Sequence, residues 1–418
     1  MTLGSTETST AVRIEKIGAQ GDGIAGDLFV PLTLPGELVH GHVSEGRIDP
    51  AGVLEPSADR VTPPCPHFGA CGGCSLQHWA AAPYLAWKRD QVAIALGRAG
   101  IATEILETFA SPPHSRRRVA LHARRDGRAV RLGFKARRSW RLVELDVCVI
   151  ADPALVRALP ALRKLAEPFL EHPKSAPTLH VTRTLTGLDI DVTGVERKHG
   201  GGLSVGARSR AAEAAAAGDF ARVTLAGEVI YQARQPVVKL GPAVVALPPG
   251  AFLQASPQAE ATMAEMMVQA VDGAARVADL FCGVGTFTFR LAQASSVYAA
   301  DSAAPAVRAL ASAIGSVPGG LKAVTSEARD LTRRPLLAME MKTLDAVVFD
   351  PPRAGAADQA REIAASKVSR VVGVSCNPTT FARDARTLVD AGFRLDKVKP
   401  IDQFLWSPHI ELVGVFSR

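Results

Sequence analysis

Four short hydrophobic runs mark the last third of the chain, and helix-like patterns separate them. The runs cover residues 277–281, 297–300, 344–349 and 371–374. Each is mostly apolar and lacks a regular alternation of polar residues, as in strands that are buried on both faces of a parallel sheet. Strands that alternate with helices in this way are typical of a doubly wound α/β domain. The pattern therefore predicts such a domain for residues 255–418.

The N-terminal part of the chain has a different pattern. Residues 11–56 alternate short β-like runs with glycine turns, and no long helical period appears there. Closely spaced strands and turns predict a small β-barrel over residues 1–60. The remaining residues, 61–254, are expected to form a central domain of mixed α+β structure.

Positive charge is concentrated in one stretch of the central region. The formal net charge is +7, yet residues 1–60 hold four basic residues against nine acidic ones. Residues 116–141 hold eleven basic residues and one acid, Asp126. Asp126-Gly127 suits a two-residue hairpin turn between the runs 119–125 and 128–134, so that the basic side chains gather on a β-ribbon. Such a ribbon indicates a polyanionic partner; a solvated hairpin without a ligand is the alternative.

The chain shows no sign of secretion or membrane insertion. Residues 1–12 are rich in Ser and Thr and lack the basic and apolar regions of a signal peptide. No stretch reaches the ~18 apolar residues that span a bilayer. We therefore expect a cytoplasmic protein.

Four of the six cysteines lie in the first half of the chain, at Cys65, Cys71, Cys74 and Cys148. In a reducing compartment, clustered cysteines indicate metal binding before disulfides. Four thiolates are the number that an iron–sulfur cluster usually takes, and zinc accepts the same four. A disulfide pair is the remaining alternative.

A glycine turn follows the first of the four predicted strands, in the motif Asp-Leu-Phe-Cys-Gly-Val-Gly at 279–285. Glycines there let the backbone approach a ligand closely, and Asp301, which ends the next strand, can accept hydrogen bonds from ribose hydroxyls. NAD would fit both features, but Thr288 stands where a dinucleotide motif has its third glycine, so an S-adenosylmethionine pocket fits better. A tight turn beside a solvated acid is the alternative without a ligand.

Two further loops end the third and fourth predicted strands. One carries Asp-Pro-Pro-Arg at 350–353, and the other carries Ser-Cys-Asn-Pro at 375–378. Both would emerge at the sheet edge that holds the cofactor, where Cys376 can present a thiolate whose pKa local dipoles or cations lower. Glu411 lies in an apolar run, and desolvation there would raise its pKa toward that of a useful base. The alternatives are a buried structural cysteine and a paired surface carboxylate.

In their order, these motifs resemble those of the RNA 5-methyluridine methyltransferase family. The resemblance rests on the three motifs above, on Arg383-Asp384, and on Asp-Gln-Phe at 402–404 with His-Ile-Glu at 409–411. It implies a Rossmann-like class I methyltransferase domain that uses S-adenosylmethionine to methylate C5 of a uridine in RNA. Because C5 of uracil is a poor nucleophile until a thiolate adds to C6, the family needs both a nucleophile and a base. The resemblance assigns these roles to Cys376 and Glu411.

The same resemblance implies a cofactor pocket made of Gln254, Phe281, Gly283, Asp301 and Asp350. Gln254 belongs to a Phe-Leu-Gln motif at 252–254, which in the family helps to hold the cofactor and the target uracil. Asp330 is a weaker candidate, because its surroundings are less distinctive. At the position of Asp301 the family more often has Glu.

The cysteine segment resembles the 4Fe-4S motif of the family branch that methylates 23S rRNA, with Gly72-Gly73 and Gln77-His78 beside the cysteines. The resemblance implies a cluster held by the four cysteines that is structural or contacts RNA. The predicted barrel resembles the OB-like TRAM domain of this branch. Since the barrel is acidic, we expect it to contribute by shape and the basic hairpin to supply most of the attraction for phosphates.

Several alternatives remain at this point. The iron–sulfur motif favours 23S rRNA as the substrate over a uridine of the tRNA T-loop. An RNA cytosine-C5 methyltransferase would carry a further Pro-Cys pair in the loop that here reads Asp-Pro-Pro-Arg. A non-catalytic RNA-binding protein with a methyltransferase fold is the alternative from another class. Neither a membrane nor an obligate protein partner is expected.

Overall fold

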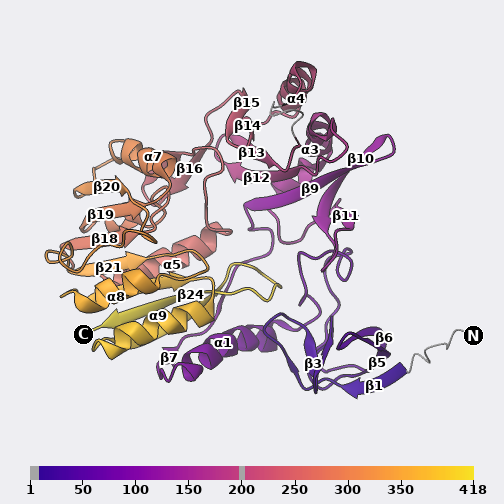
Figure 1. The fold of residues 1–418 in the computed structure, drawn as a ribbon, viewed down its shortest axis with the longest axis horizontal. Helices are drawn as coiled ribbons and strands as arrows, with labels where there is room; N and C mark the ends of the chain where they lie inside the picture. Colours follow the sequence, from indigo (N-terminus) through magenta and orange to yellow (C-terminus); the bar gives the residue numbers. More distant parts are fainter. Residues whose placement is uncertain (1–8, 197–202) are drawn as a thin grey trace, which may run out of the picture.

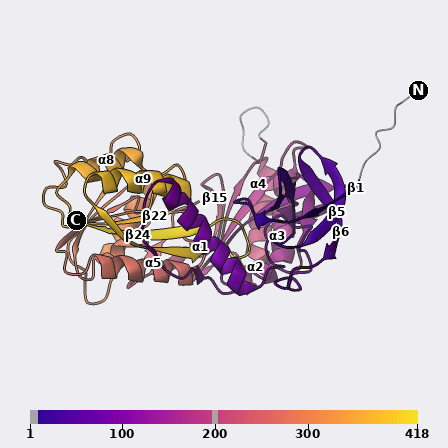
Figure 2. The same cartoon turned by 90° about the horizontal axis from the view of Figure 1, so that it is seen from below.

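A computed structural model describes residues 9–196 and 203–418. Three bodies built on sheets meet side by side, with the C-terminal sheet on the left of Figure 1, the central sheet at the upper right and the N-terminal sheet at the lower right. The long helix α1 (Ala81–Arg98) runs from beside the N-terminal sheet to the C-terminal one in both views (Figures 1 and 2). Among the described residues, no helix has both the length and the apolar character to cross a membrane.

The N-terminal sheet curls on itself (Figure 2) and has the strand order β1-β5-β6-β4-β3-β2. Its strands are β1 (Ser9–Arg13), β2 (Lys16–Ile17), β3 (Gly23–Ala25), β4 (Leu28–Val30), β5 (Leu38–Ser44) and β6 (Arg47–Glu55). Two irregularities in the pairing of β5 with β6 favour the curl, because an extra residue bends a strand. Val30, Val39 and Ile48 are fully buried inside.

The central sheet has the order β11-β10-β9-β12-β13-β14-β15. Its elements are β9 (Arg118–Asp126), β10 (Ala129–Lys135), β11 (Leu142–Glu144), α2 (Pro153–Arg157), α3 (Leu159–Ala166), the 3-10 helix η1 (Glu167–Leu170), β12 (Thr178–Thr184), β13 (Gly187–Thr193), α4 (Val205–Ala217), β14 (Arg222–Leu225) and β15 (Glu228–Gln232). The predicted hairpin is present between β9 and β10, but its two turn residues are Gly127 and Arg128, one position later than expected. Gly127 has a φ of 58°, a conformation that glycine adopts without strain.

The C-terminal sheet confirms the predicted α/β pattern. Its order is β20-β19-β18-β21-β22-β24-β23-β7, with β24 antiparallel to its neighbours. The four predicted strands are β18 (Arg276–Leu280), β19 (Ser296–Asp301), β21 (Ala346–Phe349) and β22 (Arg370–Ser375), and β20 (Val324–Ala328), β23 (Arg394–Asp402) and β24 (Glu411–Ser417) complete the sheet. One face packs against α5 (Pro257–Ala270), α6 (Thr288–Leu291) and α7 (Ala304–Ile314). The other packs against α1, α8 (Ala357–Ala365) and α9 (Pro378–Asp390).

Residues 81–110 lie with the C-terminal sheet, although the expected boundaries assign them to the central domain. After α1, the short strands β7 (Glu104–Ile105) and β8 (Phe109–Ala110) pair with β23. Val92 and Leu96 of α1 join the apolar cluster under α9, which explains why this segment leaves the central body. The hairpin of β16 (Val237–Leu240) and β17 (Ala243–Ala246) likewise packs in the core beside α7.

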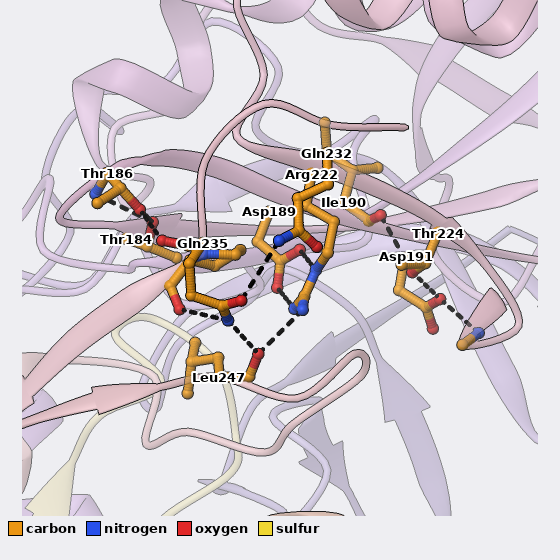
Figure 3. A network of polar contacts seen from close by, with 12 residues as sticks. Thr184, Thr186, Asp189, Ile190, Asp191, Arg222, Thr224, Gln232, Gln235 and Leu247 are labelled. Carbon is orange, nitrogen blue, oxygen red and sulfur yellow. Dashed lines mark hydrogen bonds and ion pairs between the residues drawn. The ribbon is translucent and has the colours of Figure 1, made fainter. Parts of the chain in front are cut away.

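A buried ion pair fastens the central sheet to the segment that leads into the C-terminal body (Figure 3). The guanidinium of Arg222 donates two hydrogen bonds to Asp189, at 2.8 and 2.7 Å, and a third to the Leu247 carbonyl at 3.0 Å. Gln235 donates to the same carbonyl at 3.3 Å. One side chain therefore links β13, β14 and the chain beyond β17.

We expect Arg222→Leu to lower the free energy of unfolding by about 3–5 kcal/mol, because it leaves the Asp189 carboxylate buried without its partner. Urea denaturation monitored by circular dichroism measures the change. Arg361→Leu, which breaks an exposed pair with Asp358 on α8, is the control and should cost less than about 1 kcal/mol. Equal losses in the two variants would contradict a structural role for the buried pair.

Candidate active site and cysteine pocket

A cavity of about 770 Å³ opens at the carboxyl edge of the C-terminal sheet, where the central body faces it. All the residues expected at the catalytic and cofactor sites line this cavity: Gln254, Phe281, Gly283, Asp301, Asp350, Cys376 and Glu411. Asp330, the weaker candidate, lines it as well. The strand ends thus bring together motifs that are far apart in the sequence.

The glycine turn after β18 forms one wall. Phe281 and Gly283 have φ angles of 62° and 55°, so the chain turns sharply over the strand end. The carboxylate of Asp301 accepts hydrogen bonds from the backbone N–H groups of Gly283, at 2.9 Å, and Ala303, at 2.7 Å. Each carboxylate oxygen can accept more than one hydrogen bond, so Asp301 retains capacity for a ligand's hydroxyl groups.

Thr288 has a role that the sequence did not reveal. Its hydroxyl donates a 2.6 Å hydrogen bond to Asp279, which is fully buried under the glycine turn. Burial raises the pKa of Asp279 to about 7. The residue that replaces the third glycine of a dinucleotide motif therefore donates to one oxygen of a buried carboxyl group, whose other oxygen has no partner among the described residues.

Two amide side chains join two carboxyl groups inside the cavity. Gln254 donates to Asp350 at 2.9 Å, and Gln403 donates to Gln254 at 2.8 Å and to Glu411 at 2.7 Å. The backbone N–H of Ala255 donates to the side-chain oxygen of Gln403 at 2.9 Å, which fixes the orientation of that amide. The sequence singled out Gln403 only as part of a motif, since nothing local shows that it connects two loops.

Desolvation raises the pKa values of the two carboxyl groups, Glu411 and Asp350. Glu411 is 4% exposed, which rules out a surface carboxylate, and desolvation raises its pKa well above the usual range, as its apolar neighbours predicted. Burial also raises the pKa of Asp350 to about 7. Carboxyl groups with raised pKa values can take up protons near neutral pH.

Cys376 lies half-buried at the end of β22, on the cavity wall. The next residue, Asn377, caps α9 by accepting a 3.0 Å hydrogen bond from the N–H of Thr379. The expectation of a lowered thiol pKa was wrong. Burial and the nearby carboxyl groups of Glu411 and Asp350 raise the pKa of Cys376 to about 11.

Part of the basic segment supports the cavity. Arg117 is buried, pairs with Glu260 at 2.5 Å and donates to the Gln254 carbonyl at 2.9 Å. Arg116 and Arg118 lie over the rings of Phe404 and Phe252, at 5.7 and 5.6 Å from the ring centres.

Other arginines of the segment bind acids of this chain. Arg131 pairs with Asp126, whereas Arg137 and Arg138 both pair with Asp22. The expectation that the hairpin mainly attracts phosphates therefore overlooked these internal partners, which tertiary packing supplies.

The four cysteines of the first half meet at a second, small pocket. Cys65, Cys71, Cys74 and Cys148 all line it, together with apolar side chains such as Phe134. None of the cysteines in the described residues forms a disulfide, which contradicts that alternative. Burial and mutual repulsion raise the pKa of the Cys74 thiol to about 12. As the side chains stand, no group of three or more Cys, His, Asp or Glu among the described residues is arranged to hold a metal ion.

Comparisons with known proteins point to one family. Residues 243–418 match the family model described as tRNA (Uracil-5-)-methyltransferase. An uncharacterized RNA methyltransferase of Caulobacter vibrioides is 65% identical over 97% of this chain and 99% of its own length. The 23S rRNA (uracil(1939)-C(5))-methyltransferase RlmD of Chromohalobacter salexigens is 32% identical over 98% of this chain and 90% of its own.

A solved structure shares the fold. The tRNA (uracil-54, C5)-methyltransferase of Pyrococcus abyssi, in complex with S-adenosyl-L-homocysteine, superposes with a TM-score of 0.74 at 21% identity. The likeness covers 97% of this chain and 99% of the other. It confirms the predicted class I methyltransferase architecture.

We expect Glu411→Gln to raise the melting temperature more at about pH 8 than at about pH 5. The folded protein raises the pKa of Glu411 above its unfolded value, near 4.5, so ionisation above that pH favours the unfolded chain. The neutral amide removes this ionisation. Thermal unfolding at both pH values measures the difference, with Glu265→Gln, an exposed carboxylate on α5, as control. A gain independent of pH would count against the raised pKa.

Proposed function

Because the chain belongs to the RNA uracil-C5 methyltransferase family, we propose that it methylates C5 of a uridine in 23S rRNA through a covalent bond between Cys376 and C6 of the uracil. Membership of this family makes the chain an S-adenosylmethionine-dependent RNA methyltransferase. The choice of 23S rRNA and the covalent bond to Cys376 are what we propose beyond that. The observation that carries it is that Cys376, Glu411 and the expected cofactor residues line one cavity.

The choice of 23S rRNA rests on the relative from Chromohalobacter salexigens, which is named for that substrate and aligns with 98% of this chain. The pocket of four cysteines favours the same branch. A uridine of tRNA is the second candidate. The Pyrococcus abyssi enzyme, which is named for tRNA, supports it by fold alone, at 21% identity.

We propose the following roles in the reaction. The thiol of Cys376 loses its proton to water, and the thiolate forms a bond to C6 of the uracil while the double bond between C5 and C6 opens to an enolate, which leaves C5 rich in electrons. C5 then bonds to the methyl group that S-adenosylmethionine supplies, and S-adenosylhomocysteine leaves. Glu411 then takes the proton from C5, and the bond between C6 and sulfur breaks, so that the ring regains its double bond. Gln403 keeps Glu411 oriented for this step.

The glycine turn would hold the cofactor. We propose that Asp301 accepts hydrogen bonds from the ribose hydroxyls, because its carboxylate is already fixed by two backbone N–H groups. Gly283 allows close approach of the backbone, and Phe281 and Asp350 complete the wall with Gln254. Asp330 lies at the same cavity as a further polar contact.

RNA that carries 5-fluorouridine at the target should form a complex with the wild type that survives denaturing electrophoresis. Fluorine cannot leave C5 as a proton does, so the bond to Cys376 persists. Cys376→Ala should give no such band and no methyl transfer from radiolabelled S-adenosylmethionine. Cys282→Ala, which changes a buried cysteine, is the control. Methyl transfer by the Cys376→Ala variant would contradict the proposed mechanism.

We also propose that Cys65, Cys71, Cys74 and Cys148 hold a 4Fe-4S cluster. The support is the chemistry of the pocket: four thiols with no disulfide partner surround an apolar space. Burial raises the pKa values of Cys71, Cys74 and Cys148, and bound iron would stabilise the thiolates. The cluster would tie the segment 65–74 to the loop at Cys148, a structural role.

Protein purified without oxygen should contain about four iron atoms per chain and absorb visible light broadly. Cys148→Ser should lose most of the iron, because one ligand is missing, whereas Cys282→Ser should keep it. Metal analysis of both variants tests the proposal. Zinc in place of iron, or equal iron in the two variants, would contradict it.

A further inference from the structure

A third pocket, of about 200 Å³, lies where four separate segments meet. We call it the junction pocket; its lining residues are Gln20, Gly72, Gly73, Ser75, Arg137, Arg138, Ser407, Pro408 and His409. They come from the N-terminal sheet, the cysteine loop, the turn between β10 and β11, and the loop before β24. None of these lining residues is acidic.

Backbone contacts hold the walls together. The N–H of Ser75 donates to the Trp406 carbonyl at 2.9 Å, and the N–H of Gly72 donates to the Lys135 carbonyl at 3.0 Å. Gly21, with a φ of 78°, lies so close that an added Cβ would stand 3.1 Å from the Ser75 hydroxyl. The pocket is therefore built by packing of three parts of the protein.

Two residues that line this pocket carry a buried hydrogen-bond donor with no partner in the part of the chain that the structure describes. The donors are the hydroxyl of Ser75, a residue that is only 7% exposed, and Nη1 of Arg137. A buried donor without a partner is costly, so such groups are retained where a ligand satisfies them. Both would be satisfied by a ligand that accepts hydrogen bonds.

The positive charge around the junction pocket favours an anionic ligand. Asp22 is 1% exposed and receives ion pairs from Arg47, Arg137 and Arg138, so three guanidinium groups surround one carboxylate. The net charge there is positive even after this pairing. Asp22 also orients Arg137 through its Nη2, whereas the buried Nη1 has no partner among the described residues.

We infer that the junction pocket binds one phosphodiester group of the RNA backbone close to the target uridine, through Ser75, Arg137 and Arg138; the inference rests on the proposed action on RNA. A phosphate offers several acceptor oxygens and a negative charge, which match these donors. A single loop joins the two sites: Phe404 and Glu411 line the catalytic cavity, and residues 407–409 line the junction pocket.

A phosphate held here would fix the RNA relative to the catalytic cavity. Contacts to phosphates set register and orientation, and an enzyme that works on an unstacked base needs the strand anchored beside it. The anchor would depend on all three bodies, because Asp22, Arg137 and the loop after β23 belong to different ones. Correct docking of the bodies and binding of the substrate are thus coupled.

The test compares Ser75→Ala and Arg138→Gln with the wild type in binding to transcribed 23S rRNA. We expect affinity to fall roughly 3- to 10-fold in Ser75→Ala and roughly 10-fold in Arg138→Gln. In Arg138→Gln the slope of log affinity against log salt should fall by about one. The melting temperature of Ser75→Ala should stay equal or rise, because an unpartnered buried hydroxyl is removed. A merely structural serine would give the opposite stability change.

Arg361→Gln, an exposed arginine on α8, is the matched control and should keep wild-type affinity. Arg138→Lys should recover part of the affinity, since it restores the charge without the fork of donors. Wild-type affinity and salt slope in both Ser75→Ala and Arg138→Gln would overturn the proposal.

Two further arms identify the source of the phosphate. In the shortest RNA fragment bound, a methylphosphonate linkage at one position near the target should weaken binding to the wild type but not to the double variant Ser75→Ala, Arg138→Gln. If inorganic phosphate stabilises the wild type while RNA affinity is equal in all variants, the pocket binds free phosphate and the proposal is wrong.

The proposed function can fail separately. If the wild type binds RNA but forms no 5-methyluridine, the proposed function is wrong, whereas loss of RNA binding in the variants still supports phosphate binding at the junction pocket.

Discussion

The large cavity depends on one physical constraint: two carboxyl groups in its wall, the buried Glu411 and the partly buried Asp350, must be kept hydrogen-bonded and apart. Gln254 and Gln403 do this by spanning the distance between them, because an amide donates from one end and accepts at the other. Both hydrogens and the oxygen of the Gln403 amide are used. A chain of four side chains thus connects the loops after β21 and β23, the segment before α5 and the start of β24. Its burial also accounts for the raised pKa values that a base near neutral pH needs.

Helix α1, whose residues were expected in the central domain, holds the segment that carries Gln403 in place. In α1, the hydroxyl of Tyr84 donates to Asp402 at 2.5 Å, and the ammonium group of Lys88 lies 3.0 Å from the same carboxylate. Both side chains are buried, so breaking the Lys88 contact leaves the Asp402 carboxylate without its ion partner, and breaking the Tyr84 contact removes a hydrogen bond to it. Asp402 directly precedes Gln403. The position of the amide chain therefore depends on a segment more than three hundred residues away, and on the pairing of that segment with β23.

The arginines of residues 116–141 serve two purposes. Some of them fasten the bodies to one another: Arg117 reaches Glu260, and Arg137 reaches Asp22. Several line cavities: Arg116 and Arg118 lie at the large cavity, and Arg137 and Arg138 lie at the junction pocket. A basic stretch that looks like a simple polyanion-binding ribbon thus also holds the parts of the protein together, and each Arg can do so with donors to spare, because it has five donors and an internal carboxylate occupies only some of them.

By itself, the sequence determined what depends on neighbours along the chain. Hydrophobic runs located four parallel strands, the glycine turn located the loop after the first of them, and motif order indicated which loops face one sheet edge, so that Asp301, Cys376 and Glu411 line one cavity as expected. Only the tertiary structure decided what depends on residues brought together from afar. Residues 81–110 join the C-terminal sheet, Gln403 and Gln254 together link two carboxyl groups, and the pKa of Cys376 is raised rather than lowered. The physical reason is that periodicity reflects the local backbone, whereas desolvation, ion pairing and cavity shape arise from contacts that no local pattern encodes.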